Sequence, residues 1–265
     1  MIAIALTIAG SDSCGGAGIQ ADLKTFAAFG VYGASAITAL TAQNTLGVRA
    51  IADVEPKFVA QQIDAVVEDL EVGAAKTGML ARTAVIEAVA DRLRAHCLPY
   101  LVVDPVMVAT SGDVLLEPEA VACLRDRILP LATLLTPNLR EAEVLTGRPV
   151  TDTVQMRDAA RALLDTGARA VLVKGGHLAG DAIDVLYDGR DFHEFAAPQI
   201  ATRNTHGTGC TLSAAVTACL ARGFALDEAV AAAKRYITRA ISTAPGIGHG
   251  AGPVNHFASA DKVQT

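Results

Sequence analysis

The sequence predicts a three-layer α/β/α sandwich built around a mostly parallel sheet. Short apolar segments of strand length alternate along the chain with longer segments in which apolar residues recur at helical spacing. The short segments are apolar on both faces, which is typical of parallel strands covered by helices on both sides. The chain has 265 residues, of which 51% are hydrophobic and 19% charged, so it can bury a large core. We therefore expect residues 1–265 to form a single domain.

Six segments are expected to be core strands. In chain order they are residues 2–9, 34–42, 72–78, 100–106, 132–137 and 170–176. Helices are expected between them, because apolar residues recur at helical spacing over 59–70, behind Pro56, over 85–93 and before Gly167. Residues 184–195 differ, since an Asp-Gly pair and an alternating pattern predict a hairpin at an antiparallel edge of the sheet.

Charge and cysteine usage exclude several classes of protein. The net charge is −6 and no run of Lys or Arg occurs, so neither a nucleic acid nor an anionic membrane is an expected partner. The five cysteines are scattered without a CxxC pair, which predicts neither a disulfide framework nor a zinc site. The apolar start lacks a basic leader and a cleavage site, and the uncharged segments 25–48 and 204–221 contain polar residues. A reduced, cytoplasmic protein is expected.

Ligands of such folds bind outside the carboxyl ends of the strands, which directs attention to residues 10–18, 43–44, 77–79, 104–112, 137–141 and 174–177. The first of these loops contains GAGIQA from Gly16, which formally matches a dinucleotide fingerprint. It lies several residues beyond the strand, and no acidic residue occurs between Asp22 and Asp53 to bind a ribose, which disfavours a nicotinamide enzyme. No GxxxxGK motif occurs either. The glycines indicate a backbone that approaches a ligand closely, or simply a flexible loop.

The segment THGTGC is more informative. Gly207 and Gly209 precede an uncharged helical segment, and the free N–H groups at a helix start can bind an anion without a basic side chain. Cys210 would lie in the first turn, where the pKa of a thiol tends to be lowered. The alternative is a buried structural cysteine, which is the interpretation we adopt for Cys97, Cys123 and Cys219.

Two further strand ends carry charges suited to a bound nucleotide. Asp104 closes an apolar strand and predicts Mg²⁺ held partly through water. Lys174 closes another and can neutralise charge on terminal phosphates. Asn138 and Glu141, three residues apart at a helix start, lie on one face, although they could merely cap that helix. A metal, a cation and oriented donors are what phosphoryl transfer requires.

Eight segments resemble, in order, the hydroxymethylpyrimidine/phosphomethylpyrimidine kinases of thiamine biosynthesis, which belong to the ribokinase-like superfamily. The segments are TIAGSDSCGGAGIQADLKTF, YGASAITALTAQNT, AAKTGML, VVDPVMVATSGDVLL, TPNLREAEVLTG, VLVKGGH, NTHGTGCTLSAAV and PGIGHGAGPVNHF, and they cover residues 7–257. The resemblance implies an α/β/α sandwich, usually a homodimer. It also implies ATP-dependent phosphorylation of 4-amino-5-hydroxymethyl-2-methylpyrimidine to its monophosphate, and then of the monophosphate to the diphosphate.

The resemblance also assigns roles to residues that match the family's motifs. It implies that the amide of Gln43 reads the aminopyrimidine edge, while an exposed helical lysine such as Lys234 could instead be merely solvated. The implied groups are a substrate pocket of Gly10, Asp22, Gln43, Met79 and Val106, a magnesium site of Asp104 and Glu141, an ATP site of Asn138, Lys174, Thr208 and Lys234, and catalytic residues Lys174, Gly207, Gly209 and Cys210.

Two cysteines bear on the resemblance. Most of the superfamily has an aspartate general base where this chain has Cys210, and a cysteine is expected in the pyrimidine kinase branch. An anionic phosphate needs no base, so we expect Cys210→Ala to impair the first phosphorylation more than the second. The family usually has glycine where this chain has Cys14. If that position requires a positive φ, the cysteine would be strained by roughly 1 kcal/mol or more.

Two other functions remain open at this point. A pyridoxal/pyridoxine kinase of vitamin B6 salvage would share the superfamily, and Cys210 could meet an aldehyde substrate. A non-catalytic pyrimidine-binding protein could use the same scaffold. A comparison of turnover on hydroxymethylpyrimidine with turnover on pyridoxal distinguishes the first alternative from a pyrimidine kinase. ATP consumption that does not depend on the pyrimidine would favour the second alternative.

Overall fold

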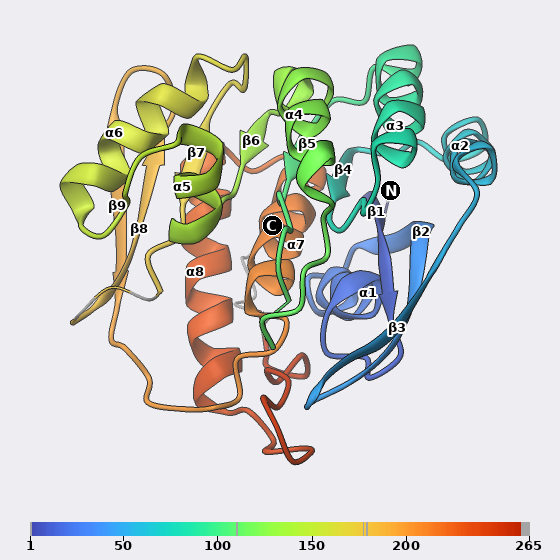
Figure 1. Cartoon of the computed structure of the whole chain (residues 1–265). Coiled ribbons are helices and arrows are strands. Elements are labelled where there is room, and N and C mark those ends of the chain that lie inside the picture. The colour runs from blue at the N-terminus through green and yellow to red at the C-terminus, as the bar shows by residue number, and fades with distance from the viewer. Residues whose placement is uncertain (1, 110, 177, 179, 261–265) are drawn as a thin grey trace.

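One sheet of nine strands runs through the computed structural model, which describes residues 2–109, 111–176, 178 and 180–260 (Figure 1). Thr110 and His177, in two of the segments singled out from the sequence, lie outside the described residues. The strands are β1 (Ile4–Asp12), β2 (Tyr32–Asn44), β3 (Gly47–Asp53), β4 (Ala74–Thr77), β5 (Leu101–Val103), β6 (Leu134–Leu135), β7 (Val171–Val173), β8 (Ala182–Tyr187) and β9 (Phe192–Ala197). The helices are α1 (Gly18–Ala28), α2 (Pro56–Val67), α3 (Thr83–His96), α4 (Pro118–Arg127), α5 (Leu139–Thr146), α6 (Thr153–Leu164), α7 (Thr208–Ala221) and α8 (Leu226–Ser242), with a 3-10 turn at Leu129–Leu131.

The strand order is β3-β2-β1-β4-β5-β6-β7-β8-β9. The pairs from β2 to β7 are parallel, which confirms the predicted core strands, although β6 is only two residues long. The predicted edge hairpin is also confirmed, since β8 pairs antiparallel with both β7 and β9. The sequence analysis missed β3, which pairs antiparallel with β2. Residues 49–53 of β3 are exposed, so they lack the apolar pattern by which the core strands were found.

Helices cover both faces of the sheet and produce two apolar cores. Side chains of α2, α3, α4, α5 and α6 pack on one face, and α1, α7 and α8 pack on the other, as Figure 1 shows. The three-layer α/β/α architecture is therefore as predicted.

Local sequence explains where the helices begin and end. Pro56 occupies the first turn of α2, whose buried face carries Val59 and Ile63, and the helix ends at Val67 rather than at the expected residue 70. Residues 211–220 of α7 are all buried, which accounts for its lack of charge, because an unpaired charge there would be strongly destabilising. Among the described residues, no helix is both long enough and apolar enough to span a membrane.

The direction in which successive strands are added to the sheet reverses at β1. The chain adds β2 and β3 on one side of β1, then returns to place β4 on the other side. Loops diverge at such a switch point and leave a crevice at the carboxyl ends of the strands, where ligands of open α/β sheets bind. The first turn of α7 lies at this end too, since a cavity described below is lined both by strand ends and by Gly207, Thr208 and Gly209.

Candidate active site

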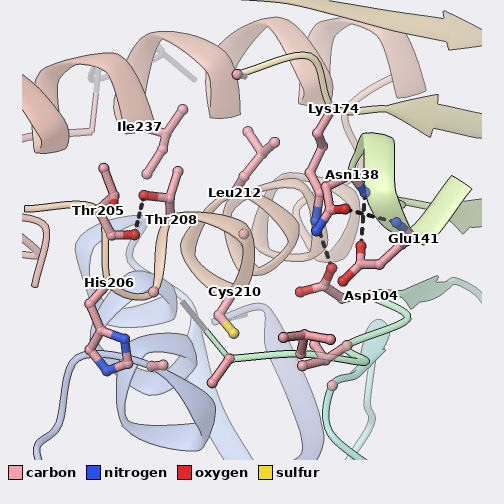
Figure 2. Close-up of a pocket in the computed structure, with 18 of the residues that line it drawn as sticks. Asp104, Asn138, Glu141, Lys174, Thr205, His206, Thr208, Cys210, Leu212 and Ile237 are labelled. Carbon is pink, nitrogen blue, oxygen red and sulfur yellow. Dashed lines mark hydrogen bonds and ion pairs between the residues drawn. The ribbon is translucent and has the colours of Figure 1, made fainter. Parts of the chain in front are cut away.

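A cavity of about 910 Å³ lies at the carboxyl ends of β1, β4, β5 and β7. Most of the residues predicted from the sequence line it: Gly10, Gln43, Met79, Val106, Asp104, Asn138, Glu141, Lys174, Gly207, Thr208, Gly209, Cys210 and Lys234. Figure 2 shows part of this wall, with Cys210 on the first turn of α7 and the Lys174 side chain pointing toward Asp104.

The start of α7 has the geometry expected of an anion-binding turn. Gly207 is its N-cap with a φ of 79° and no capping side chain. A side chain on Gly207 would also collide with the carbonyl oxygen of Gly16, so only glycine fits. Thr208 and Thr211 use their N–H groups for local bonds, whereas the N–H groups of Gly209 and Cys210 have no acceptor among the described residues. These two amides and the helix dipole can therefore bind an anion.

Lys174 and Asp104 form an ion pair beside this turn. Lys174 Nζ lies 2.8 Å from Asp104 Oδ1, and a Cβ on Gly209 would lie 3.2 Å from the same Nζ. The ammonium and the free amides thus face a common space. Burial alone would raise the pKa of Asp104, but the charges of Lys174 and Lys76 and the hydrogen bonds from Lys174 and Ser213 together outweigh it, and the net effect lowers that pKa. The carboxylate is accordingly charged and able to bind a cation.

Glu141 and Asn138 form a reciprocal cap at the start of α5. Glu141 accepts a bond from the Asn138 N–H at 2.8 Å, and the Asn138 side chain accepts from the Glu141 N–H at 2.9 Å. The capping alternative considered from the sequence is therefore real, yet both residues also line the cavity. Burial raises the pKa of Glu141 to about 7 despite the nearby Lys174, and the charge of Asp104 adds to that increase.

The expected lowering of the Cys210 pKa is wrong. Burial raises the pKa of this thiol to about 11. The Lys76 ammonium and an N–H bond from Gly18 oppose that effect, but the carboxylates of Asp104 and Asp22 reinforce it. Proximity to a helix start therefore does not outweigh desolvation here, and the thiol is neutral at physiological pH.

Asp22 does not line the cavity, contrary to the expectation from the resemblance. It is fully buried below the site, where both carboxylate oxygens accept bonds from Lys76 Nζ, at 2.8 and 2.9 Å, and Thr7 donates a third at 2.6 Å. Burial at this depth would raise the pKa of the carboxyl, and Lys76 offsets that increase only in part. The chain therefore places a buried ion pair beneath the cavity at this position, where direct contact with a substrate was expected.

Gln43 is held in place by two hydroxyl side chains that sequence analysis missed. The Ser13 hydroxyl donates to the Gln43 carbonyl at 2.8 Å and accepts from its N–H at 2.9 Å. The Thr41 hydroxyl lies 3.0 Å from Gln43 Oε1 and can donate to it. A bond to Oε1 leaves the amide Nε2 available as a donor, and Gln43 lines the cavity. Hydroxyl residues are too common in loops for spacing alone to have identified these two.

Lys234 is not a solvated surface lysine. It is 8% exposed, and its Nζ donates to Asp184 Oδ2 and to the Ala182 carbonyl oxygen, each at 2.8 Å. It lines the cavity, but its ammonium is engaged in joining α8 to β8. The alternative raised from the sequence, that Lys234 is merely solvated, is therefore wrong.

Cys14 and Cys97 also depart from expectation. Cys14 does not have a positive φ; the adjacent Gly15 does, at 79°. The feared strain at Cys14 is therefore absent, and the loop accepts a cysteine there. Cys97, expected to be buried, is exposed and ends α3 in the left-handed region with a φ of 49°.

Comparisons with known proteins now decide the family. The family model described as phosphomethylpyrimidine kinase matches residues 12–255. The chain belongs to the phosphomethylpyrimidine kinase family. It is 59% identical to the hydroxymethylpyrimidine/phosphomethylpyrimidine kinase of Rhizobium meliloti over 97% of this chain and 98% of that protein. The family resemblance and the kinase class predicted from the sequence are thus confirmed.

Solved structures confirm the ribokinase-like fold. The phosphomethylpyrimidine kinase of Clostridium difficile matches with a TM-score of 0.81 and 46% identity, covering 91% of this chain and 100% of that one. An ADP complex of Bacillus subtilis pyridoxal kinase matches with a TM-score of 0.91 and 41% identity, covering 97% and 98% of the two chains. A phosphomethylpyrimidine kinase and a pyridoxal kinase therefore share this scaffold, and the fold alone does not choose between their substrates.

Proposed function

We propose that the chain transfers phosphoryl groups from ATP first to hydroxymethylpyrimidine and then to the resulting monophosphate, as part of thiamine diphosphate biosynthesis. The observation that carries this proposal is one continuous cavity with an anion-binding turn between Lys174 and Gln43. Its volume of about 910 Å³ is at the upper end of the range for small-molecule sites, about 300–1,000 Å³. It can therefore accept a nucleotide and a small aromatic substrate together. The relative from Rhizobium meliloti named above supports the choice of substrate.

The roles of the charged residues follow from where charge develops. In phosphoryl transfer the migrating group carries charge on its equatorial oxygens, and catalysis depends on positioning and electrostatics. The free amides of Gly209 and Cys210 would hold that group. The Lys174 ammonium would move away from Asp104 and neutralise charge on the donor phosphates. Asn138 and Thr208 would contact the nucleotide on the same side of the cavity. Lys234 would contribute indirectly, because it anchors the β8–β9 hairpin at the wall of the cavity.

Asp104 and Glu141 fit a magnesium ion that arrives with the nucleotide. Mg²⁺ prefers hard oxygen ligands and is usually bound by one or two carboxylates together with waters and phosphates. Among the described residues, no group of three or more His, Cys, Asp or Glu side chains could hold a metal ion. The remaining ligands would therefore come from waters and phosphates. When bound, the ion would neutralise charge on the phosphates. Glu141 must lose its proton to take part, because its pKa is about 7.

The opposite end of the cavity suits an aminopyrimidine. Gln43 Nε2 can donate to a ring nitrogen, and its Oε1 can accept from an amino group. Met79 and Val106 provide apolar walls, and Gly10 leaves room for the ring because a Cβ there would lie 3.1 Å from the Met79 sulfur. Pyridoxal has no amino group beside a ring nitrogen, so we expect it to be the poorer substrate.

We also propose that the protein is a cytoplasmic homodimer, with β2 and β3 in the contact. β3 is an edge strand, and Leu40, Leu46 and Ile51 are exposed on this hairpin. Exposed apolar residues along an unpaired edge favour association. All five cysteines are free thiols, as a reducing compartment requires. Light scattering of the wild type and of Ile51→Lys tests the contact: a monomeric wild type refutes it.

One assay tests the catalytic proposal. The protein is incubated with Mg²⁺–ATP and either hydroxymethylpyrimidine or pyridoxal, and mono- and diphosphate products are measured by mass spectrometry. We expect both pyrimidine products and a lower kcat/KM for pyridoxal. Pyridoxal phosphate as the main product would favour the vitamin B6 kinase, and ATP hydrolysis that is independent of the pyrimidine would favour a binding protein.

A further inference from the structure

The Asp12 carboxylate collects four hydrogen bonds at the end of β1. Its Oδ1 accepts from the Cys14 N–H at 2.8 Å. Its Oδ2 accepts from the N–H groups of Gly16 and Ala17 at 3.0 and 2.9 Å, and lies 2.8 Å from His206 Nε2. Three of these donors belong to the first loop. The fourth comes from a residue 194 positions further along the chain.

His206 stands at the entrance to the anion-binding turn. It directly precedes Gly207, the N-cap of α7. Its backbone is fixed on the other side by the carboxyl-terminal segment, since its N–H donates to the Gly252 oxygen at 3.0 Å. A side chain on Gly16 would collide with the His206 ring. The first loop and the turn before α7 are therefore packed directly against each other, with His206 between them (Figure 2).

The bond between Asp12 and His206 is buried and charge-assisted. The two side chains are 3% and 6% exposed. A carboxylate only accepts hydrogen bonds, so His206 Nε2 must carry the hydrogen. Burial alone would raise the pKa of Asp12, but the bonds from His206 and the loop amides produce a net lowering. The carboxylate thus keeps its charge, and bonds of this kind are roughly twice as strong as neutral ones.

These contacts join the two halves of the reaction site. The substrate side is built on the end of β1, where Gly10 lines the cavity, and the anion-binding turn is built on α7. We infer that Asp12 and His206 are positioning residues that set the distance between the anion-binding turn and the substrate pocket. This inference rests on the proposed kinase function. Neither residue is expected to exchange a proton with the substrate, because both carboxylate oxygens and the His206 Nε2 are engaged within the protein.

Misplacement of a reacting group by about 1 Å can reduce a rate by about 10²-fold. We therefore expect His206→Leu to lower kcat for both phosphorylations by about 10- to 100-fold, with KM for ATP changed less than about threefold. The nucleotide contacts on Lys174 and Asn138 are not part of this linkage. His206→Gln should restore most of kcat, because its Nε2 can donate from nearly the same position. Asp12→Asn should lose kcat as His206→Leu does, since an amide cannot accept all four bonds.

His256→Leu is the matched control. His256 is also buried, at 6% exposure, and it contacts the same helix through Thr211 Oγ1 at 3.1 Å. Within the described part of the chain, it makes no hydrogen bond to the first loop. Each variant is assayed with kcat expressed per folded molecule and its melting temperature recorded. We expect both leucine variants to melt earlier and only His206→Leu to lose kcat. If His206→Leu does not fold, Asp12→Asn carries the same prediction.

The inference would be overturned by wild-type kcat in folded His206→Leu or Asp12→Asn, or by an equal loss of kcat in His256→Leu. Failure of His206→Gln to recover activity would also count against it, since the hydrogen bond would then not be what matters. The wild type is measured first. A wild type that does not phosphorylate hydroxymethylpyrimidine refutes the proposed function, whereas an active wild type with unimpaired variants refutes only the positioning role.

Discussion

Replacing Cys210 by alanine should separate the two phosphorylations. The hydroxymethyl group of the first substrate must lose a proton as it attacks, whereas the phosphate of the second is already an anion. Cys210 is the thiol on the anion-binding turn. Its removal should therefore slow the first step more than the second.

The raised pKa limits how large this difference can be. With a pKa of about 11, ionising the thiol at pH 7.5 costs about 5 kcal/mol, at about 1.4 kcal/mol per pKa unit. A base so rarely ionised should contribute at the low end of general-base catalysis, about 10²-fold or less. We expect Cys210→Ala to lower kcat of the first step by about 10- to 100-fold and that of the second by less than about threefold.

The assay starts separately from hydroxymethylpyrimidine and from its monophosphate, and counts each product by mass spectrometry. Cys219→Ala serves as the control, because Cys219 is a buried thiol of the same helix that packs in the core and also has its pKa raised by burial to about 11. It should leave the ratio of the two rates unchanged. Equal losses in both steps for Cys210→Ala would refute the reasoning and indicate that the side chain only shapes the turn.

Three further predictions concern buried polar groups. Because burial raises the pKa of Glu141 to about 7, protons should compete with Mg²⁺ below that pH, and the KM for Mg²⁺ should rise by up to about tenfold per pH unit; a flat profile from pH 5.5 to 8 contradicts this. Burial lowers the pKa of His256 from 6.5 to about 4, so its neutral form favours the fold and stability present above pH 6.5 is lost as the pH falls toward 4. Up to about 3 kcal/mol is involved, and urea unfolding should show a shallower pH dependence in His256→Gln. The Thr77 hydroxyl is buried without a hydrogen-bond partner among the described residues, so Thr77→Val should raise the free energy of unfolding by about 1 kcal/mol; a loss of that size would reveal a partner.

Two simple rules explain why most of the residues proposed from the sequence line one cavity. Apolar periodicity located the core strands, and residues just beyond strand ends meet at one edge of a parallel sheet. Asp104 and Lys174 were therefore expected near each other, and their side chains form an ion pair.

What the sequence did not predict depends on contacts between distant residues. The pKa of Cys210 is set by burial and by the opposing charges of Lys76, Asp104 and Asp22, which no local pattern encodes. Asp22 was assigned to the pocket, but its partner Lys76 lies 54 positions away and holds it underneath. The ion pair between Lys234 and Asp184 joins residues 50 positions apart, and the sequence did not predict it either. Strand β3 escaped notice because its side chains face solvent.

The bond between residues 12 and 206, together with the bridge between residues 206 and 253, closes the reaction site with parts from near both ends of the chain. The polypeptide must therefore extend past residue 206 before the reaction site can be complete, and products truncated before that residue should lack turnover. Contacts of such wide separation also form slowly. Acquisition of turnover during refolding should accordingly lag behind the appearance of helical structure.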